Sequence, residues 1–280
     1  MFLKNSDNIF ENFNEKEFGY YLAGLFEGDG HIWIASKYDI KNYKKNPQFC
    51  ITMHKNNLKV AESLVKKIGY GWVRKKVREN AIVFTITNEK GFLKLLYLLY
   101  NKLKTPKIEK INQLIEWLND NRGHKINLYN YNLKEVAKDL NNYWLCGFTD
   151  ADGCFYIRVS RLKNKSRVAF RFSIDQRMVD PMTGKSYIFI MDAIANKLKT
   201  KNSIITRKHG TYFRIEATSK ESLNNILDYF DLYPLQSIKY LDYIDWKTGI
   251  DLYTKRHRIN AGLLVSLKKL KNNMNSLRSL

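Results

Sequence analysis

The residues most able to do chemistry lie in two acidic motifs. Each motif is a stretch of apolar and small residues that ends with the pair Asp-Gly. The first is Leu22-Ala-Gly-Leu-Phe-Glu-Gly-Asp-Gly30, and the second, 123 positions later, is Leu145-Cys-Gly-Phe-Thr-Asp-Ala-Asp-Gly153. If both stretches are helices and the helices pair, Asp29 and Asp152 meet. Two adjacent carboxylates repel each other, and divalent cations relieve that repulsion. The motifs therefore predict a metal site with one aspartate from each copy.

Carboxylates together with phosphate oxygens from a nucleic acid suit Mg²⁺, a hard cation. The backbone carbonyls of Gly28 and Ala151, next to the acids, are candidate further ligands. Metals held in this way can activate a water and neutralise a leaving oxygen. A single Asp-Gly pair is more often a plain helix end than a metal site, but two copies favour the metal site.

The charge of the chain indicates what such a site would act on. Lys and Arg number 48 against 27 Asp and Glu, which gives a net charge of +21. A surplus of this size predicts a polyanionic partner, with nucleic acid first and an anionic membrane surface second. A protein that is merely basic is the plainer alternative. We expect no transmembrane helix, and we expect the three cysteines to be free thiols. Carboxylates and charge together predict a metal-dependent nuclease.

Small residues precede each aspartate at matching positions. Gly24 and Gly28 are four residues apart, as are Gly147 and Ala151. Small residues at this spacing leave a notch on one helix face, where another backbone can approach closely. We therefore predict that two notched helices cross at these residues, form the interface between two lobes and bring the two aspartates together.

The similarity between the two halves extends beyond the motifs. Phe49-Cys-Ile-Thr-Met53 corresponds to Phe172-Ser-Ile-Asp-Gln176, and a later Lys110 to Trp117 segment corresponds to the segment from Lys239 to Trp246. Three landmarks in the same order indicate an internal repeat. We predict a first lobe over residues 1–119, a polar linker over 120–140 and a second lobe over 141–280.

Each lobe shows a helix followed by alternating segments and further helices. Asn14 with Glu17 predicts a helix over 15–29, and alternation predicts half-buried strands with one polar face. Helical patterns occupy 56–67, 89–103, 106–119, 185–199, 219–230 and 236–253. The predicted fold class is α+β, with two αββαββα lobes and antiparallel sheets. A basic amphipathic helix from Ala261 has no counterpart in lobe one; packing back on lobe two is favoured over a separate DNA-binding arm.

The paired motifs and their spacing resemble the LAGLIDADG family of homing endonucleases in its single-chain, two-motif form. The resemblance covers nearly the whole chain. It implies a pseudo-symmetric monomer whose saddle-shaped sheets bind a long, asymmetric DNA target. It also implies double-strand cleavage that leaves 3′ overhangs and requires Mg²⁺, with Mn²⁺ as a substitute. Family members are usually encoded within organelle introns, so we expect a mitochondrial protein, with the chloroplast as the alternative.

The resemblance also assigns roles to individual residues. Asp29 and Asp152 match the metal-binding acids. Lys110 and Lys239 match basic residues that flank the active site and organise its waters. Gln176 matches a polar position near the scissile phosphates.

Two departures from the family pattern lie close to the aspartates. The position in lobe one that corresponds to Gln176 is Met53, which cannot form a strong hydrogen bond, so the two half-sites are expected to act unequally. Glu27 replaces the first aspartate of the motif, whereas lobe two keeps Asp150. We expect Glu27 and Asp150 to be structural or to support the catalytic acids, because they lie on another helix face.

The exposed strand faces are the predicted DNA-binding surface. In lobe one, alternation selects His31, Trp33, Ala35, Lys37, Asn46, Gln48, Cys50, Thr52, Arg74, Lys76, Arg78 and Thr85. In lobe two, it selects Cys154, Tyr156, Arg158, Ser160, Arg167, Ala169, Arg171, Ser173, Thr206, Lys208, Tyr212, Arg214 and Glu216. Arg and Gln can form bidentate bonds to base edges. Each of these residues could equally contact a phosphate instead of a base edge.

Two other functions are compatible with the same sequence. A maturase would bind its own group I intron RNA and assist splicing, either instead of cutting DNA or as a second activity. A DNA-binding protein could keep the fold without catalysis. Both acids are intact, so nothing in the sequence argues for lost cleavage.

Overall fold

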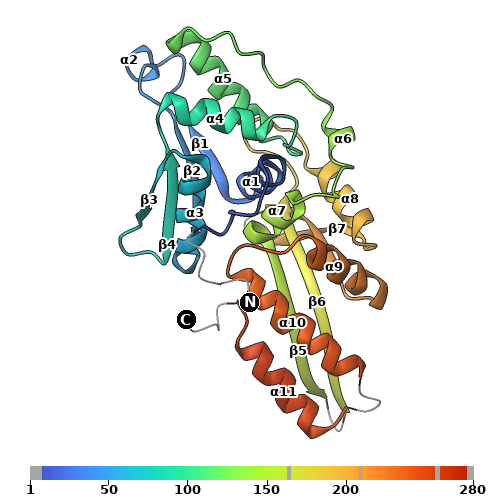
Figure 1. Cartoon of the computed structure of the whole chain (residues 1–280). Helices are drawn as coiled ribbons and strands as arrows, with labels where there is room; N and C mark the ends of the chain where they lie inside the picture. The colour runs from blue at the N-terminus through green and yellow to red at the C-terminus, as the bar shows by residue number, and fades with distance from the viewer. Residues whose placement is uncertain (1–7, 163–164, 208–209, 256–258, 276–280) are drawn as a thin grey trace. The chain divides into compact units, whose positions relative to one another are not determined.

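The computed structural model describes residues 8–162, 165–207, 210–255 and 259–275. The chain packs into two compact units (Figure 1). Unit 1 is Met1–Ala151 with Val179–Ile190, and unit 2 is Asp152–Met178 with Met191–Leu280. These units follow packing, whereas the predicted lobes follow the sequence repeat, so the lobe boundaries stay a prediction.

Unit 1 is built on sheet 1, a four-stranded antiparallel sheet with the order β1-β2-β4-β3. Its strands are β1 Gly30–Trp33, β2 Gln48–His54, β3 Trp72–Lys75 and β4 Ala81–Ile86. Its helices are α1 Glu15–Asp29, α2 Ile40–Tyr43, the 3-10 helix η1 Lys55–Asn57, α3 Leu58–Ile68, α4 Glu89–Leu99, α5 Ile108–Arg122, α6 Leu133–Val136 and α7 Trp144–Asp152, whose last residue belongs to unit 2.

Local sequence explains where α1 begins and ends. The Asn14 side chain accepts a hydrogen bond from the Glu17 N–H at 2.9 Å, and Glu17 Oε2 accepts one from the Asn14 N–H at 3.1 Å. This capping box satisfies two N–H groups that the first helical turn leaves without partners. At the other end Gly30 takes an extended conformation and starts β1. The predicted helix over 15–29 is confirmed, and it places Asp29 at the junction of helix and sheet.

Unit 2 is built on sheet 2, a four-stranded antiparallel sheet with the order β5-β6-β8-β7. Its strands are β5 Gly153–Leu162, β6 Lys165–Arg177, β7 Asn202–Arg207 and β8 Gly210–Ala217, and its helices are α8 Ile188–Lys197, which begins in unit 1, α9 Lys220–Leu232, α10 Lys239–Thr254 and α11 Ala261–Asn272. Phe155 joins sheet to helices, because its ring lies 5.0 Å from that of Phe172 and 5.3 Å from that of Trp246.

The predicted α+β class and the αββαββα pattern are confirmed in both halves. Some boundaries differ from the prediction. The helix expected from residue 106 begins at Ile108, because the Thr105 N–H and hydroxyl both donate to buried Glu27. The short helices α2 and α6 were not predicted. Among the described residues no helix is both long and apolar enough to cross a membrane.

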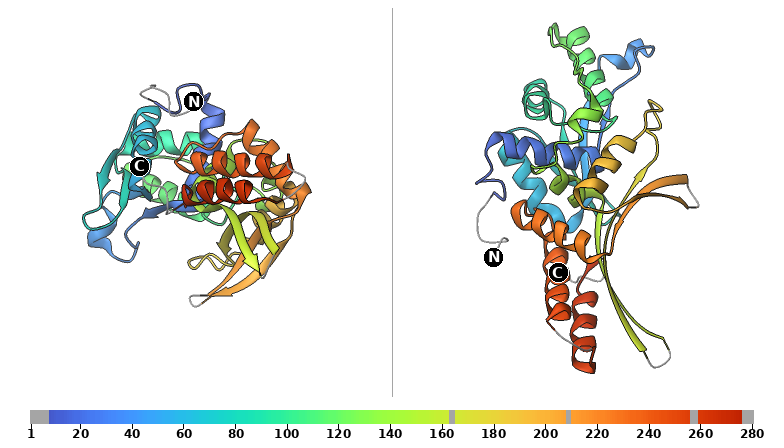
Figure 2. Two further views of the ribbon diagram at one scale, coloured as in Figure 1. Left: turned by 90° about the horizontal axis from the view of Figure 1, so that it is seen from below. Right: turned by 90° about the vertical axis from the view of Figure 1, so that its right-hand side faces the viewer.

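Helix α11 packs back on unit 2, as the sequence favoured. It lies beside α10 (Figure 2) and also contacts β5. Its apolar residues Leu263 and Leu267 are buried. A Cβ atom built on Gly249 of α10 would lie 2.9 Å from the Ile157 side chain and 3.0 Å from the Phe170 ring, so a glycine lets α10 lie close to β5 and β6.

Candidate active site and nucleic-acid interface

Helices α1 and α7 cross inside unit 1 at the predicted glycines. A Cβ atom on Gly24 would lie 1.9 Å from the Trp144 carbonyl oxygen, and one on Gly147 would lie 2.1 Å from the Tyr21 carbonyl oxygen. No side chain fits at such distances, so each glycine admits the backbone of the other helix. The close backbone approach expected at the notch is present at Gly24 and Gly147, while their role as an interface between lobes stays a prediction. The interface roles of Gly28 and Ala151 stay predictions.

Two reciprocal hydrogen bonds fasten the crossing. The Trp144 indole N–H donates to Glu27 Oε2 at 2.6 Å, and the Tyr21 hydroxyl donates to Asp150 Oδ2 at 3.0 Å. Tyr21 and Trp144 occupy equivalent positions in the repeat, as do Glu27 and Asp150. Each motif therefore supplies one aromatic donor and one buried acid to the other. Both acids hold the helices together, as expected from the helix face they occupy.

Glu27 also fastens the segment that leads into α5. Its carboxylate accepts hydrogen bonds from the N–H groups of Lys104 and Thr105 and from the Thr105 hydroxyl. Complete burial raises the pKa of Glu27, while the donors from Thr105, Lys104 and Trp144 lower it. Burial has the larger effect. Glu27 therefore ties α1, α7 and the start of α5 into one unit.

Asp29 and Asp152 are the last residues of α1 and α7, and both are partly buried. Gln176, near the end of β6, donates from Nε2 to Asp152 Oδ2 at 3.4 Å. Met53 pairs with Ile82 in sheet 1 and is 5% exposed. A polar contact to the aspartate thus exists in unit 2, while the corresponding residue of unit 1 offers only a thioether.

A lysine that the sequence analysis missed lies next to Asp29. Lys107 Nζ donates to the carbonyl oxygens of Phe26, Gly28 and Gly30 at 3.2, 2.8 and 2.9 Å. An ammonium group at a helix C-terminus stabilises the exposed carbonyls there and complements the helix dipole. The position of Lys107 depends on the packing of α5 against β1 and on the hydrogen bonds of Lys104 and Thr105 to Glu27, so no local pattern could have singled it out.

The two predicted lysines lie at other positions. Lys110 is one helical turn beyond Lys107, and its Nζ donates to Gln113 Oε1 at 3.3 Å. Desolvation by burial lowers the pKa of Lys110, and Asp180 partly offsets that effect. Lys239 is the first residue of α10 and is partly buried. Their catalytic roles stay predictions.

Most of the predicted DNA-contacting side chains of lobe one lie on one face of sheet 1. We call this face, which includes His31, Trp33 and Arg74, the polar face of sheet 1. The strand register aligns His31 with Cys50 and Thr85, Trp33 with Gln48, and Thr52 with Val83 and Arg74. Desolvation lowers the pKa of His31, and the positive charges of Lys107, Lys76 and Lys110 lower it further. This face is therefore basic even though its histidine tends to be neutral.

Among the residues expected on this face, Lys37 and Asn46 lie outside the strands and already have partners. Strand β1 ends at Trp33, so alternation does not continue to Lys37, whose Nζ pairs with Glu116 Oε2 at 3.0 Å. The extension of the strand to Lys37 was wrong. Asn46 precedes β2, and its amide donates to the Thr87 carbonyl at 3.0 Å. Both side chains already have partners in the free protein.

Two further expectations for this face need correction. Thr85 is only 4% exposed because it lies on a central strand between Cys50 and Trp72 of the neighbouring strands. Its predicted exposure was wrong. Arg78 was expected on a strand, but it lies in the turn between β3 and β4, where its φ is 72°. Trp72, which the sequence analysis did not select, is 45% exposed on this face.

The corresponding polar face of sheet 2 follows the predicted alternation on β5 and β6. The register aligns Tyr156 with Arg171, Arg158 with Ala169, and Ser160 with Arg167. On β8 the residues of this face are Tyr212, Arg214 and Glu216. Thr206 pairs with Thr211 and so lies on the opposite face, which corrects its placement. Lys208 lies outside the described residues.

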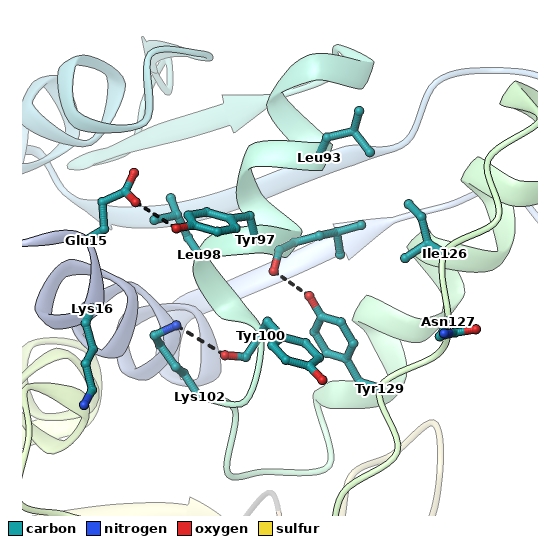
Figure 3. Close-up of a pocket in the computed structure, with 11 residues that line it drawn as sticks. Glu15, Lys16, Leu93, Tyr97, Leu98, Tyr100, Lys102, Ile126, Asn127 and Tyr129 are labelled. Carbon is teal, nitrogen blue, oxygen red and sulfur yellow. Dashed lines mark hydrogen bonds between the residues drawn. The ribbon is translucent and has the colours of Figure 1, made fainter.

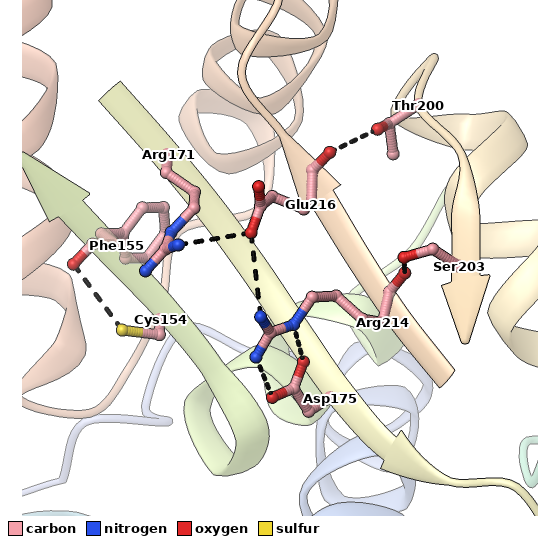
Figure 4. A network of polar contacts seen from close by, with 8 residues as sticks. All are labelled: Cys154, Phe155, Arg171, Asp175, Thr200, Ser203, Arg214 and Glu216. Atoms are coloured by element: carbon pink, nitrogen blue, oxygen red, sulfur yellow. Dashed lines mark hydrogen bonds and ion pairs between the residues drawn. The ribbon is translucent and has the colours of Figure 1, made fainter. Parts of the chain in front are cut away.

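Four charged residues form a network on the polar face of sheet 2 (Figure 4). Arg214 donates from Nε and Nη2 to the two carboxylate oxygens of Asp175, at 2.6 and 2.7 Å. Arg171 Nη1 lies 3.3 Å from Glu216 Oε2, and its guanidinium lies 5.1 Å from the centre of the Tyr156 ring. This part of the face therefore carries fixed arginines rather than mobile ones.

A cavity of about 580 Å³ lies among the helices of unit 1 and is lined by residues of α1, α4 and the segment after α5 (Figure 3). Tyr97, Tyr100 and Tyr129 line it, and the Tyr97 hydroxyl donates to Glu15 at 3.0 Å. None of the predicted catalytic residues lines it. This cavity therefore does not mark the proposed active site.

Comparison with known proteins identifies the family. The family model described as LAGLIDADG endonuclease matches residues 22–118 and 145–250. The chain belongs to the LAGLIDADG endonuclease family. The two LAGLIDADG helices are α1 and α7, and both sheets lie within the matched regions. The match ends before α11, in agreement with the absence of a counterpart for that helix in lobe one.

Two relatives of this LAGLIDADG chain are intron-encoded proteins of yeasts. An uncharacterised cox1 intron-2 protein of Schizosaccharomyces pombe is 33% identical over 263 residues, which cover 89% of this chain and 71% of the relative. The intron-encoded DNA endonuclease aI3 of Saccharomyces cerevisiae is 29% identical over 276 residues, which cover 86% of this chain and 66% of the relative. The relatives are thus longer than this chain.

A solved structure confirms the LAGLIDADG fold. The homing endonuclease I-LtrWI, bound to its target DNA, superposes with a TM-score of 0.73 at 18% identity, over 95% of this chain and 100% of that protein. Within the described residues, no group of three or more His, Cys, Asp or Glu side chains is assembled for a metal.

Proposed function

We propose that this chain is a site-specific homing endonuclease that cuts both strands of a long, asymmetric DNA target and leaves 3′ overhangs. The observation that carries the proposal is the α1–α7 crossing, where the glycines of the two motifs admit each other's backbone. Each aspartate follows its crossing glycine by five residues. Equal spacing from a shared contact favours convergence of Asp29 and Asp152.

Asp29 and Asp152 would hold Mg²⁺, and Mn²⁺ would substitute because it accepts the same oxygen ligands. The carbonyl oxygens of Gly28 and Ala151 are the proposed further protein ligands. The Gly28 carbonyl already accepts a hydrogen bond from Lys107 at 2.8 Å. A carbonyl oxygen has a second lone pair, so this bond leaves it able to bind a cation. Bound metal would activate the attacking water and stabilise the leaving 3′ oxygen.

Three lysines and one glutamine would support the reaction. Lys107, Lys110 and Lys239 would supply positive charge near the reacting phosphates, where charge develops in the transition state. Gln176 would help to position a water or phosphate beside Asp152, given its contact at 3.4 Å. Met53 cannot do the same in the other half, so we propose that the two strands are cut at unequal rates.

The polar faces of the two sheets are the proposed DNA-binding surface. On sheet 1 the proposed contacts are His31, Trp33, Gln48, Thr52, Trp72, Arg74 and Lys76, with Arg78 at the adjoining turn. On sheet 2 they are Tyr156, Arg158, Ser160, Arg167, Arg171, Ser173, Tyr212, Arg214 and Glu216. The two sets differ in size and chemistry, so the target would be asymmetric.

The relatives support a proposal about the genomic setting. Their names place them in introns, one of them in cox1. We propose that this protein is likewise encoded in a mitochondrial intron and acts as a monomer, because one chain contains both motifs. Binding of group I intron RNA, the alternative drawn from the family resemblance, rests on no observation in the described part of the chain.

The decisive experiment compares Asp29→Asn and Asp152→Asn with the wild-type protein on a target selected from a randomised DNA library in Mg²⁺. Each variant should abolish double-strand cleavage and leave DNA affinity nearly intact, because Asn keeps the shape but binds a divalent cation poorly. Asp39→Asn, on an exposed helix cap, is the matched control and should cleave normally. Wild-type cleavage rates in either active-site variant would exclude the proposed metal site.

A further inference from the structure

The ion-pair network of sheet 2 divides its polar face into two parts with different electrostatics. Arg171, Asp175, Arg214 and Glu216 lie together on β6 and β8, and their charges sum to zero. Nearer the β5–β6 turn, Arg158 and Arg167 are exposed and have no ion pair among the described residues. One strand pair thus carries both neutralised and unneutralised arginines on the same face.

The Asp175 carboxylate leaves one edge of the Arg214 guanidinium open. A guanidinium group has five N–H donors in a rigid fork. Asp175 occupies the edge formed by Nε and Nη2. The end edge, formed by Nη1 and Nη2, keeps two parallel donors, since Glu216 lies 3.9 Å from Nη1, beyond hydrogen-bond distance. Two parallel donors match the O6 and N7 acceptors of guanine.

Neutralisation changes what Arg214 can gain from DNA. A lysine or arginine with no carboxylate nearby gains free energy from any phosphate, whatever the sequence. Arg214 gains less from a phosphate, because Asp175 already balances its charge and repels the phosphate. A guanine edge still offers two hydrogen bonds to the open donors. Cross-strand pairing with Asp175 also fixes the guanidinium plane, which lowers the entropy lost on binding.

We propose that Asp175 and Arg214 form a guanine-reading unit in which Asp175 is the positioning residue, and that Arg158 and Arg167 supply phosphate affinity instead. Glu216 restrains Arg171, stacked on Tyr156, in a similar way. This inference rests on the proposed function, because it requires that the polar face of sheet 2 binds DNA. It assigns specificity and affinity to different residues of one face.

The test measures binding to a randomised DNA library and the salt dependence of affinity for the selected target. Arg214→Lys keeps the charge but loses the fork. It should reduce the preference for guanine at one position by roughly 5- to 150-fold and leave binding to unrelated DNA unchanged. Asp175→Asn frees the arginine charge. It should raise affinity for unrelated DNA, steepen the salt slope by about one and weaken the same guanine preference.

Arg167→Gln is the matched control and lies on β6, the strand that carries Asp175. It should weaken binding to all sequences alike, reduce the salt slope by about one and keep the guanine preference. Thermal unfolding checks that each variant is folded. If Asp175→Asn does not fold, the base preference of Arg214→Lys alone tests the inference. An unchanged base preference in folded Arg214→Lys would overturn the inference. A wild-type protein that selects no sequence at all would instead overturn the proposed function.

Discussion

At the scale of single residues, the proposed chemistry depends on charges placed around the end of α1. Lys107 contacts three carbonyl groups on either side of Asp29, while Lys110 points along its own helix to Gln113. The two lysines differ by one helical turn, yet only Lys107 bonds to the backbone that carries the aspartate. Contact with that backbone makes Lys107 the stronger candidate for an active-site role.

Replacing Lys107 by Met should slow cleavage more than it weakens DNA binding. Loss of one charged donor near a reacting group costs on the order of 10²-fold in rate. Lys110→Met is the comparison variant and should have a smaller effect. Single-turnover cleavage at saturating protein separates rate from affinity, and thermal unfolding controls for the lost carbonyl contacts. Equal cleavage rates for Lys107→Met and the wild-type protein would show that Lys107 has no role in the active site.

At the scale of elements, the crossing of α1 and α7 determines where the two aspartates can lie. Gly24 and Gly147 set the closeness of the helices, and the Trp144–Glu27 and Tyr21–Asp150 hydrogen bonds set their rotation. These contacts are buried, so their loss should reduce stability before it affects chemistry.

Gly24→Ala should destabilise the protein strongly, because its Cβ atom would lie 1.9 Å from a backbone oxygen. Overpacking of this kind costs about 1–3 kcal/mol, and more where backbone must move. Gly262→Ala in α11 is the control, since its Cβ atom would meet only the Asn260 side chain, at 3.6 Å. It should be neutral or slightly stabilising. Chemical denaturation compares the two, and equal free energies of unfolding would contradict the close-approach model.

Glu27→Gln should lower stability and remove part of its pH dependence. The amide nitrogen would face N–H donors that now bond to a carboxylate, at a cost of about 1–3 kcal/mol. Burial raises the pKa of Glu27 above its ordinary value of 4.5, so the folded state binds this proton more tightly than the unfolded state does. The contribution to stability therefore falls as pH rises from about 4.5 through the folded pKa. Identical pH profiles of the melting temperature in both proteins would refute this.

At the scale of the whole molecule, the net charge of +21 and the two polar sheet faces favour extended contact with DNA phosphates. Ion pairs at Lys37, Arg171 and Arg214 show that some of the positive charge is balanced internally. The remaining lysines and arginines would displace counterions from DNA on binding. Affinity should therefore depend on salt even where specificity does not.

Affinity for the selected target should fall steeply as salt increases. A protein that contacts 6–10 phosphates loses on the order of 10³- to 10⁵-fold between roughly 50 and 200 mM salt. Fluorescence anisotropy with a labelled target measures the slope. A flat salt response would contradict binding along the polar faces of the sheets.

The sequence by itself determined the repeat, the bounds of α1, the glycine notch and the αββαββα order. The repeat is read by comparing segments 123 positions apart. The other features depend on neighbours in the chain: a capping box spans three residues, and alternation depends only on successive side chains. Only the tertiary structure decided that Lys107 bonds to the carbonyls around Asp29, that Asp175 holds Arg214, and that Thr206 faces away. These contacts join residues up to 81 positions apart. Helix packing and strand register set them, and neither can be read from local pattern.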